Sequence, residues 1–223
     1  KMKILCLIPA RHKSKRLPNK NFLKINGKFL IEWTLSLSSK IKDFNEIVLS
    51  SDNTKIFSLK KKYPKVFFQK RPKKISTSKT KMESVIKYTL LELKKMGKSF
   101  DAIVVLQPTS PLRKIKTITD AIKKFKKYSP NYLASVKSLK HTQTPKTIFK
   151  FPSKQLIKKL NINVNNKINN RYYSLDGGVI FIFKIPNKKY KLHGKGAFIE
   201  VKFPESIDID YKEDFLLAKK FLK

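Results

Sequence analysis

The stretch ILCLIPARHKSKRLPNKN, residues 4–21, joins an apolar run to a basic loop. Its first five letters, ILCLI, are uninterrupted apolar side chains, which predict a buried strand. The remainder is rich in basic and neutral polar side chains, has two prolines and lacks an acid, so a loop is expected where the strand ends. A loop that collects this much positive charge at a strand end indicates a binding site for an anion.

Outward from this strand, short apolar runs alternate with amphipathic segments. Residues 47–49, 66–68 and 103–106 predict further strands, because polar or turn-forming residues bound each run. Apolar residues recur at helical spacing in the segments 30–37, 82–93 and 115–125. This order predicts right-handed crossovers and an α/β fold with a doubly wound, mainly parallel sheet of the Rossmann type. Ligands of such sheets bind beyond the carboxyl ends of the strands, where the basic loop is expected.

The alternation breaks between residues 141 and 170, where asparagine and lysine dominate. We expect a small irregular or hairpin excursion from the sheet here. Apolar runs resume at 179–183 and 197–201, and apolar positions at 215, 218 and 222 predict a closing helix. The length of 223 residues fits one domain over residues 1–223.

Composition excludes several classes of protein. The longest apolar runs reach about seven residues, far below the roughly 20 that cross a bilayer, and no signal-peptide pattern is present. We therefore expect a cytoplasmic protein without a membrane segment. The only cysteine, Cys6, lies within the first apolar run, which predicts a buried thiol and no internal disulfide. With six glycines and no G-x-x-x-x-G-K motif, the P-loop class is excluded.

The formal net charge of +37 raises the alternative of a basic, nucleic-acid-associated domain. Only five of the 52 basic residues are arginines, and the lysines are scattered through nearly every segment. No zinc-finger spacing or aromatic RNA-binding motif accompanies them. We therefore expect a lysine-rich, solvated surface and no specific nucleic-acid partner.

The basic loop is the first candidate site. Arg11, Lys15 and Lys20 surround Ser14, and Pro9 and Pro18 restrict the course of the chain. Such side chains can surround a triphosphate, although a merely solvated basic loop is the simpler alternative. Two of the five arginines fall in this loop, which favours the anion site.

Two further strand ends carry polar residues. In VLQPTSPLR, residues 105–113, Gln107 could bind a polyhydroxy ligand with donors and an acceptor; alternatively Ser110 caps a helix that begins at Pro111. In SSDNTKI, residues 50–56, Asp52 is expected to cap the following helix.

The segment SIDID, residues 206–210, places Asp208 and Asp210 two residues apart in a chain with 15 acids. In extended backbone both carboxylates point to one side and can hold one hard cation. The alternative is that Asp210 caps the closing helix and Asp208 balances a lysine.

Taken in order, the blocks IPARHKSKRLPNKN, RPKKIS, LQPTSPLR, DGGVIFIFK and SIDIDYKEDF resemble the motifs of the acylneuraminate cytidylyltransferase family, the CMP-sialic acid synthetases. The resemblance covers almost the whole chain. It implies a nucleotidyltransferase fold, a homodimer with residues 141–170 as a contact, and a reaction of CTP with a nine-carbon 2-keto sugar acid. In that reaction the anomeric oxygen attacks the α-phosphate and pyrophosphate leaves.

The resemblance also implies roles for single residues. Nucleotide and triphosphate would be bound by Arg11, Lys15, Lys20, Asn21, Arg71 and Thr80. Gln107 would contact the sugar acid or the nucleotide. Lys20 with the magnesium ligands Asp208 and Asp210 would form the catalytic set. The family's segment with a functional arginine reads NNKIN here, which leaves Lys167 or Arg171 as its replacement.

Several alternatives stay open on this resemblance. The acceptor could be pseudaminic, legionaminic or 3-deoxy-octulosonic acid, and the nucleotide could differ. The other possibility is a catalytically silent relative, which the retention of both aspartates in SIDID disfavours.

Overall fold

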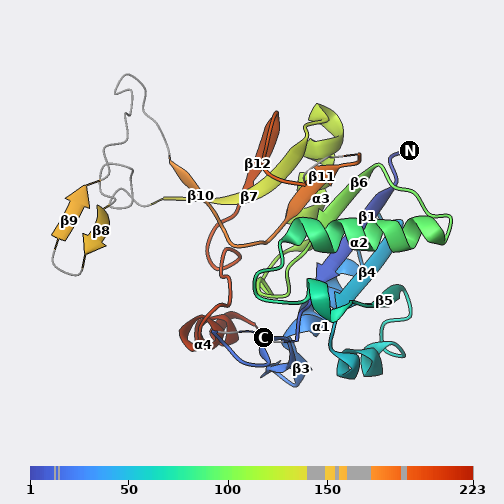
Figure 1. The fold of residues 1–223 in the computed structure, drawn as a ribbon, viewed down its shortest axis with the longest axis horizontal. Coiled ribbons are helices and arrows are strands. Elements are labelled where there is room, and N and C mark those ends of the chain that lie inside the picture. The colour runs from blue at the N-terminus through green and yellow to red at the C-terminus, as the bar shows by residue number, and fades with distance from the viewer. Residues whose placement is uncertain are drawn as a thin grey trace.

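An eight-stranded, mostly parallel sheet forms the centre of the computed structural model (Figure 1). The structure describes residues 1–12, 14, 16–139, 149–153, 156–159, 172–186 and 190–222, without the side chains of 149–153 and 156–159. The strands of the sheet are β1 (Ile4–Pro9), β4 (Glu46–Ser51), β5 (Val66–Lys70), β6 (Ala102–Val105), β7 (Tyr132–Ser138), β10 (Tyr173–Leu175), β11 (Phe181–Lys184) and β12 (Gly196–Glu200). The α-helices are α1 (Leu30–Ser38), α2 (Met82–Lys95), α3 (Ile115–Tyr128) and α4 (Lys212–Phe221).

The order of the strands confirms the predicted α/β fold. The path is β10-β7-β11-β6-β1-β4-β5, with β12 on β7. β1 pairs in parallel with both β4 and β6, and β4 with β5, so the four strands predicted from apolar runs lie side by side. β11 is antiparallel to β6 and β7, which brings its amino end to the same edge as the carboxyl ends of β1 and β6.

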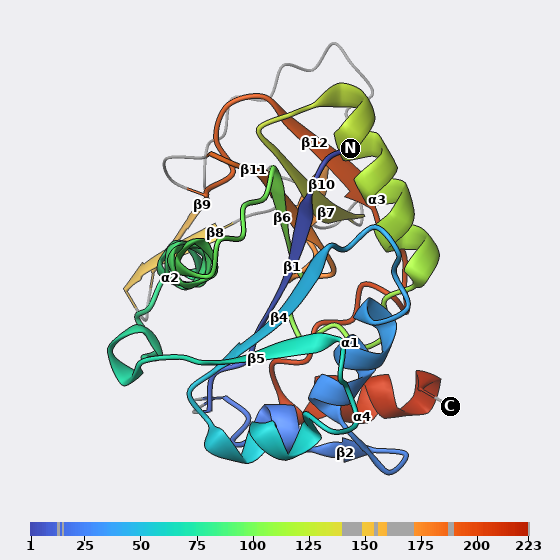
Figure 2. The ribbon, with the colours of Figure 1, turned by 90° about the vertical axis from the view of Figure 1, so that its right-hand side faces the viewer.

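Residues of β1 explain why both faces of the sheet are covered. Successive side chains of a strand point to opposite faces. Ile4, Cys6 and Ile8 pack with α1 and α3, whereas Leu5 and Leu7 pack with α2. Figure 2 shows α2 on one side of β1 and β4 and α1 and α3 on the other. These side chains are 0–1% exposed, and burying each isoleucine or leucine contributes about 1.5–3 kcal/mol to stability.

A third apolar cluster attaches the closing helix to the sheet. Ala218 and Leu222 of α4 pack with Ile25, Ile207 and Ile209. Ile25 belongs to a small hairpin of β2 (Lys24–Ile25) and β3 (Lys28–Phe29) that lies between the basic loop and α1. The cluster therefore fixes the residues 206–210 against the start of the chain.

The excursion after β7 contains the expected hairpin. β8 (Phe149–Ser153) and β9 (Leu156–Lys159) form a separate antiparallel pair, which Figure 1 shows apart from the main sheet. The end of β7 and the start of β10 lie side by side: the Leu139 amide donates to the Tyr172 carbonyl at 2.9 Å.

Two predicted helix caps are wrong. The 3-10 helix Thr54–Leu59 is capped by Asn53, whose side chain accepts from the Lys55 amide, while Asp52 turns toward the loop after β1. α3 begins at Ile115 instead of Pro111, and the carboxylate of Glu205 accepts from the Lys114 amide at 2.9 Å. Both acceptors come from side chains that local sequence spacing did not single out.

In the part of the chain that the structure describes, no helix is long and apolar enough to cross a membrane. Cys6 is buried as expected, and burial raises the pKa of its thiol. Its neutral thiol is therefore part of the core.

Candidate active site

A pocket of about 590 Å³ opens at the carboxyl edge of the sheet. Its walls come from the loop after β1, the segment after β5, the loop after β6, the turn before β11 and residues 208–210. It is lined by every predicted site residue that the structure describes, namely Arg11, Lys20, Asn21, Arg71, Thr80, Gln107, Asp208 and Asp210. Lys15, Lys167 and Arg171 lie outside the described residues.

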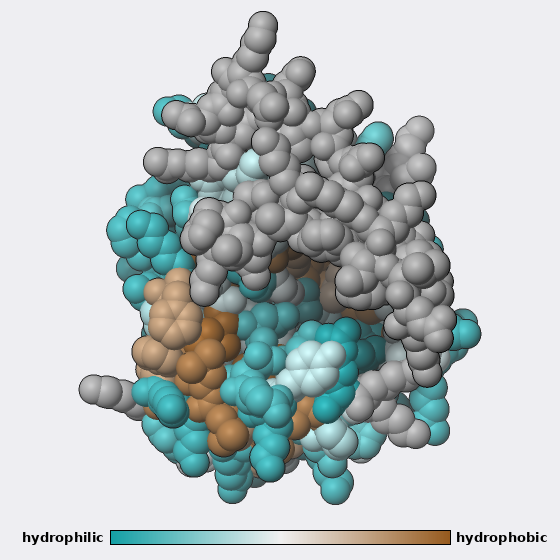
Figure 3. Space-filling model, turned by 90° about the vertical axis from the view of Figure 1, so that its left-hand side faces the viewer, coloured by the Kyte–Doolittle hydropathy of each residue, from teal (hydrophilic) through white to brown (hydrophobic). Residues whose placement is uncertain are grey.

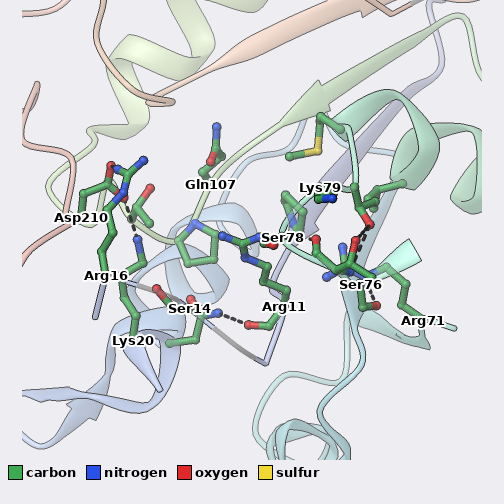
Figure 4. A pocket seen from close by; sticks show the side chains of 18 of the residues that line it. Arg11, Ser14, Arg16, Lys20, Arg71, Ser76, Ser78, Lys79, Gln107 and Asp210 are labelled. Carbon is green, nitrogen blue, oxygen red and sulfur yellow. Dashed lines mark hydrogen bonds and ion pairs between the residues drawn. The ribbon is translucent and has the colours of Figure 1, made fainter. Parts of the chain in front are cut away.

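Figure 4 shows two ends of this pocket. Arg11, Arg71 and the loop of residues 76–80 form one end, which we call the basic end. Gln107, Asp208 and Asp210, together with the turn Gly177-Gly178, form the opposite end, which we call the acidic end.

At the basic end, Arg71 is the most enclosed cation. It is 4% exposed, its Nε donates to the Ser76 hydroxyl at 3.1 Å, and its Nη2 lies 3.9 Å from the Asp52 carboxylate. Burial lowers the pKa of Arg71, the charge of Asp52 opposes that shift, and the charge of Arg11 adds to it. Two arginines that repel each other beside a single carboxylate favour the arrival of an anion.

The rest of the basic end is loop backbone with short side chains. Arg11 Nη1 donates to the Thr77 carbonyl at 3.4 Å, and the side-chain Nδ2 of Asn21 donates to the Arg11 carbonyl at 3.1 Å. The Thr80 hydroxyl accepts from the Thr77 amide at 3.1 Å, which closes the loop on itself. Asn21 and Thr80 therefore shape the basic end besides lining it.

At the acidic end, the predicted alternation of residues 206–210 is confirmed. Ile207 and Ile209 are 7% and 0% exposed in the third apolar cluster, so Asp208 and Asp210 face the pocket. Lys20 Nζ lies 3.2 Å from Asp210 Oδ1 and donates to the Ile209 carbonyl at 2.6 Å. Lys20 thus reaches the acidic end from the basic loop.

The alternative role of Asp210 as the cap of α4 is wrong. α4 receives its capping carboxylate from Asp214, which accepts from the amides of Asp210 and Tyr211 at 3.0 and 2.8 Å. The side chain of Asp210 instead pairs with Arg16 and Lys20. The charge of Lys20 also acts on Asp208, so the alternative that Asp208 balances a lysine stays open.

The surroundings of Asp208 disfavour the charged form of its carboxyl group. Burial raises the pKa of its carboxyl group, and the charge of Asp210 adds to this, against a hydrogen bond with Thr109 and the charge of Lys20. Its Oδ1 is buried without a hydrogen-bond partner among the described residues. Two neighbouring carboxylates, one with an oxygen that accepts no hydrogen bond, supply the oxygen ligands that a hard cation such as Mg²⁺ prefers. The described residues include no cluster of three or more His, Cys, Asp or Glu, so substrate or water oxygens would have to complete the coordination.

The glycine turn brings the acidic end together. A Cβ on Gly177 would lie 2.2 Å from Asp208 Oδ2, and a Cβ on Gly178 would lie 2.6 Å from Gln107 Nε2. Both glycines also have positive φ angles, 103° and 143°. Gln107 Nε2 donates to the Gly177 carbonyl at 3.1 Å, so only glycine lets both Gln107 and Asp208 approach the turn this closely.

Three residues of this region were not predicted from the sequence. Arg16 contacts Asp210 and lies over the ring of Tyr211, and the scarcity of arginine in the chain was the signal that could have identified it. Asp176 is 2% exposed and accepts from the Gly178 amide at 3.0 Å. Arg113 is 4% exposed and lies behind the acidic end of the pocket. Its position in LQPTSPLR did not indicate which residues it contacts.

Comparison with known proteins gives concordant matches. A family model described as Cytidylyltransferase matches residues 5–214. The CMP-N,N'-diacetyllegionaminic acid synthase of Legionella pneumophila is 29% identical over 237 residues, which cover 100% of this chain and 97% of that protein. The N-acylneuraminate cytidylyltransferase of Escherichia coli O18:K1:H7 is 26% identical over 97% of this chain and 51% of that protein. The pseudaminic acid cytidylyltransferase of Campylobacter jejuni is 33% identical over 56% of this chain and 53% of that protein.

Solved structures agree on the fold. A CMP:2-keto-3-deoxy-manno-octonic acid synthetase complexed with CTP has a TM-score of 0.67 at 13% identity, with 98% of each chain covered. A 4-diphosphocytidyl-2C-methyl-D-erythritol synthase has a TM-score of 0.66 at 12% identity, with 100% of each chain covered.

Proposed function

Because the chain belongs to the cytidylyltransferase family, we propose that it joins CTP to a nine-carbon 2-keto sugar acid, giving the CMP-sugar and pyrophosphate. The observation that carries this proposal is the shared pocket, in which eight residues predicted from motifs far apart in the sequence line one cavity. Arg11 and Arg71 lie at one end, and two carboxylates, one of them paired with Arg16 and Lys20, lie at the other, which matches a reaction between a triphosphate and a second substrate.

In this proposal the triphosphate lies against the basic end. Arg11 and Arg71 neutralise its charge, and Lys20 extends toward the phosphates that depart. The anomeric oxygen of the sugar acid, oriented by Gln107, forms a bond to the α-phosphorus, and the bond between the α-phosphorus and the bridging oxygen of pyrophosphate breaks. Phosphoryl transfer of this kind depends on positioning and charge neutralisation more than on covalent help from the protein.

We propose that Asp208 and Asp210 hold Mg²⁺. The orphaned Asp208 oxygen and the raised pKa of that carboxyl group support this assignment, because a bound cation removes both penalties. When bound, the ion would screen the repulsion between triphosphate and sugar acid and acidify the attacking hydroxyl. The described pocket offers no histidine as a general base, in keeping with such a role.

The choice of sugar acid is the finer part of the proposal. The relative aligned over the whole chain is named for N,N'-diacetyllegionaminic acid, while those named for pseudaminic and N-acylneuraminic acid align over a smaller share of one or both chains. A diacetylated nonulosonic acid is therefore the first acceptor to test.

A pyrophosphate-release screen tests the proposal directly. CTP, UTP, GTP and ATP are each combined with legionaminic, pseudaminic, N-acetylneuraminic and 3-deoxy-octulosonic acids, with and without Mg²⁺. We expect release with CTP and a nonulosonic acid when Mg²⁺ is present. Release only with 3-deoxy-octulosonic acid, or only with another nucleotide, would refute the substrate assignment.

A cytoplasmic homodimer completes the proposal. The excursion 141–170, of which the structure describes only 149–153 and 156–159, is the candidate contact. Figure 3 shows an apolar patch on the face toward which the β8–β9 hairpin of Figure 1 extends. The large apolar side chains exposed on or beside α4 include Phe203, Leu216, Leu217 and Phe221. Exposed apolar patches mark contact surfaces in many proteins. Light scattering at several concentrations would show a mass of one chain if the dimer does not exist.

A further inference from the structure

Arg113 lies behind the acidic end without lining the pocket. Its guanidinium donates to the Val179 carbonyl at 3.0 Å, the Thr34 hydroxyl at 2.8 Å, the Gln107 carbonyl at 2.5 Å and the Gly178 carbonyl at 3.2 Å. These acceptors belong to three separate segments: α1, the loop after β6 and the turn before β11. The planar guanidinium can bridge them, whereas a lysine ammonium could not hold the same directions.

Burying the positive charge of Arg113 costs free energy of desolvation, and its hydrogen bonds must offset that cost. Burial lowers the pKa of Arg113 to about 10, and nearby acidic groups, among them Asp176, oppose the shift only in part. In some proteins the hydrogen bonds of a buried ionic group fix a geometry that apolar packing would not. Here that geometry is the backbone of both sides of the acidic end.

One nitrogen makes the decisive pair of contacts. Nη2 donates to the carbonyl of Gln107 and to the carbonyl of Gly178, so it fixes the spacing of these two backbones. Asp176 holds the same turn through its amides, accepting from Gly178 at 3.0 Å and from Val179 at 3.3 Å. In the same turn, Gly177 lies against Asp208 and its carbonyl accepts the side-chain hydrogen bond of Gln107.

We infer that Arg113 is a positioning residue for the sugar-acid side of the pocket: it sets the distance between Gln107 and the glycine turn, and through that turn the place of Asp208. The inference rests on the proposed function. All three guanidinium nitrogens donate to segments of the acidic end or to α1, and none to Arg11, Arg71 or the 76–80 loop. Loss of Arg113 should therefore change how the sugar acid is placed and leave CTP binding intact.

The test separates the two substrates kinetically. In Arg113→Lys we expect the KM for the sugar acid to rise about tenfold or more and kcat to fall, because small displacements of positioned groups have effects of this size. The dissociation constant of CTP, measured by calorimetry, should stay within about threefold. A residue with only a structural role would lower the folded fraction, which scales kcat and leaves both constants unchanged.

Two further variants protect the test against poor folding of Arg113→Lys. Thr34→Val removes a single acceptor of Arg113 on α1, and should raise the sugar-acid KM in the same direction by a smaller factor. Thr89→Val is the control, because Thr89 is a buried hydroxyl that bonds Gln69 outside the pocket and should leave both substrate constants unchanged.

Coupling to Gln107 gives the deciding measurement. If Arg113 acts through Gln107, the rise in sugar-acid KM caused by Arg113→Lys should shrink in a Gln107→Ala background. Fully additive effects, an unchanged sugar-acid KM or an equal loss of CTP affinity would overturn the inference. Failure of the proposed function is distinct from these results, since the wild-type protein would then release no pyrophosphate with CTP and any sugar acid.

Discussion

The two ends of the pocket are built on different physical principles. The basic end consists of two arginines beside a loop of mostly short side chains, and its contacts include weak ones such as the 3.4 Å bond from Arg11 to Thr77. The acidic end consists of short side chains pressed against a glycine turn, with Arg113 buried behind it. Long side chains can adjust to a flexible anion, whereas the acidic end has little freedom to adjust.

This difference predicts how each end responds to substitution. A change at the acidic end displaces neighbours that cannot move aside, so its effects on turnover should be large. A change at the basic end removes one of several charges around the triphosphate, so its effects should be smaller and should appear mainly in CTP affinity.

The largest effect is expected from Asp208→Asn and Asp210→Asn. Each keeps the size of the side chain and removes the charge, so turnover should fall about a hundredfold or more, the scale of losing a directed electrostatic contact. CTP binding without metal should change by no more than a few-fold. Initial rates of pyrophosphate release across a Mg²⁺ titration provide the measurement.

Asp120→Asn is the matched control for these variants. Asp120 pairs with Lys116 on the exposed face of α3, so the variant loses the same charge at a distance from the pocket and should keep full turnover. The melting temperature of Asp208→Asn should be equal to or above that of the wild type, because burial raises the pKa of Asp208 and its charge therefore weakens the fold at neutral pH. Near-normal turnover in both aspartate variants would eliminate the metal site.

Gly177→Ala is expected to have the next largest effect. The added methyl group would overlap the Asp208 carboxylate, so kcat should fall between about ten- and a hundredfold through misplacement of that group. Gly97→Ala controls for the backbone, since Gly97 has a φ of 73° and open space around its Cβ position. If both variants lose stability equally and neither loses more kcat than the other, the contact with Asp208 has no role in turnover.

Lys20→Ala tests the residue that joins the two ends. We expect a rise in the KM for CTP and a fall in kcat, each by about tenfold, because the cation stabilises charge that grows on the departing phosphates. Lys24→Ala removes an exposed lysine outside the pocket and should change neither constant. Normal kinetics in Lys20→Ala together with Arg11→Ala would restore the alternative of a solvated basic loop.

The smallest effect is a shift in thermal stability. At about a hundredfold excess over its dissociation constant, CTP with Mg²⁺ should raise the melting temperature by about 5 to 10 °C. UTP and GTP at equal concentration should shift it less. A larger shift with either of them, read by differential scanning fluorimetry, would contradict the assignment to cytidine.

Periodicity predicted the parts of the fold that depend on burial. The apolar run of residues 4–8 forms β1. The alternation in SIDID correctly predicted that its isoleucines lie in the core and its aspartates line the pocket. Strand ends on a parallel sheet meet at one edge, which is why the residues that follow β1 and β6 could be assigned to one site from the order of the apolar runs.

Other features depend on contacts between distant parts of the chain and left no local pattern. Arg113 reaches carbonyls 65 and 66 residues later in the sequence. Asp52 was assigned to a cap because it precedes a helix, yet its carboxylate accepts from the His12 amide across the sheet edge. The roles of Gly177 and Gly178 emerge only when Asp208 and Gln107 are placed beside them.

Because Leu139 and Tyr172 lie within hydrogen-bond distance, the segment between them can be replaced by another. A hydrogen bond joins the two ends of the excursion, and Ser138 pairs with Tyr173 in the sheet. The core that carries the pocket therefore holds both ends of the excursion in place by its own contacts. Closing a loop of a different length costs little, about 0.6 kcal/mol for each doubling. A short turn, or a segment from another member of the family, could therefore be grafted between these strands while the sheet keeps its register.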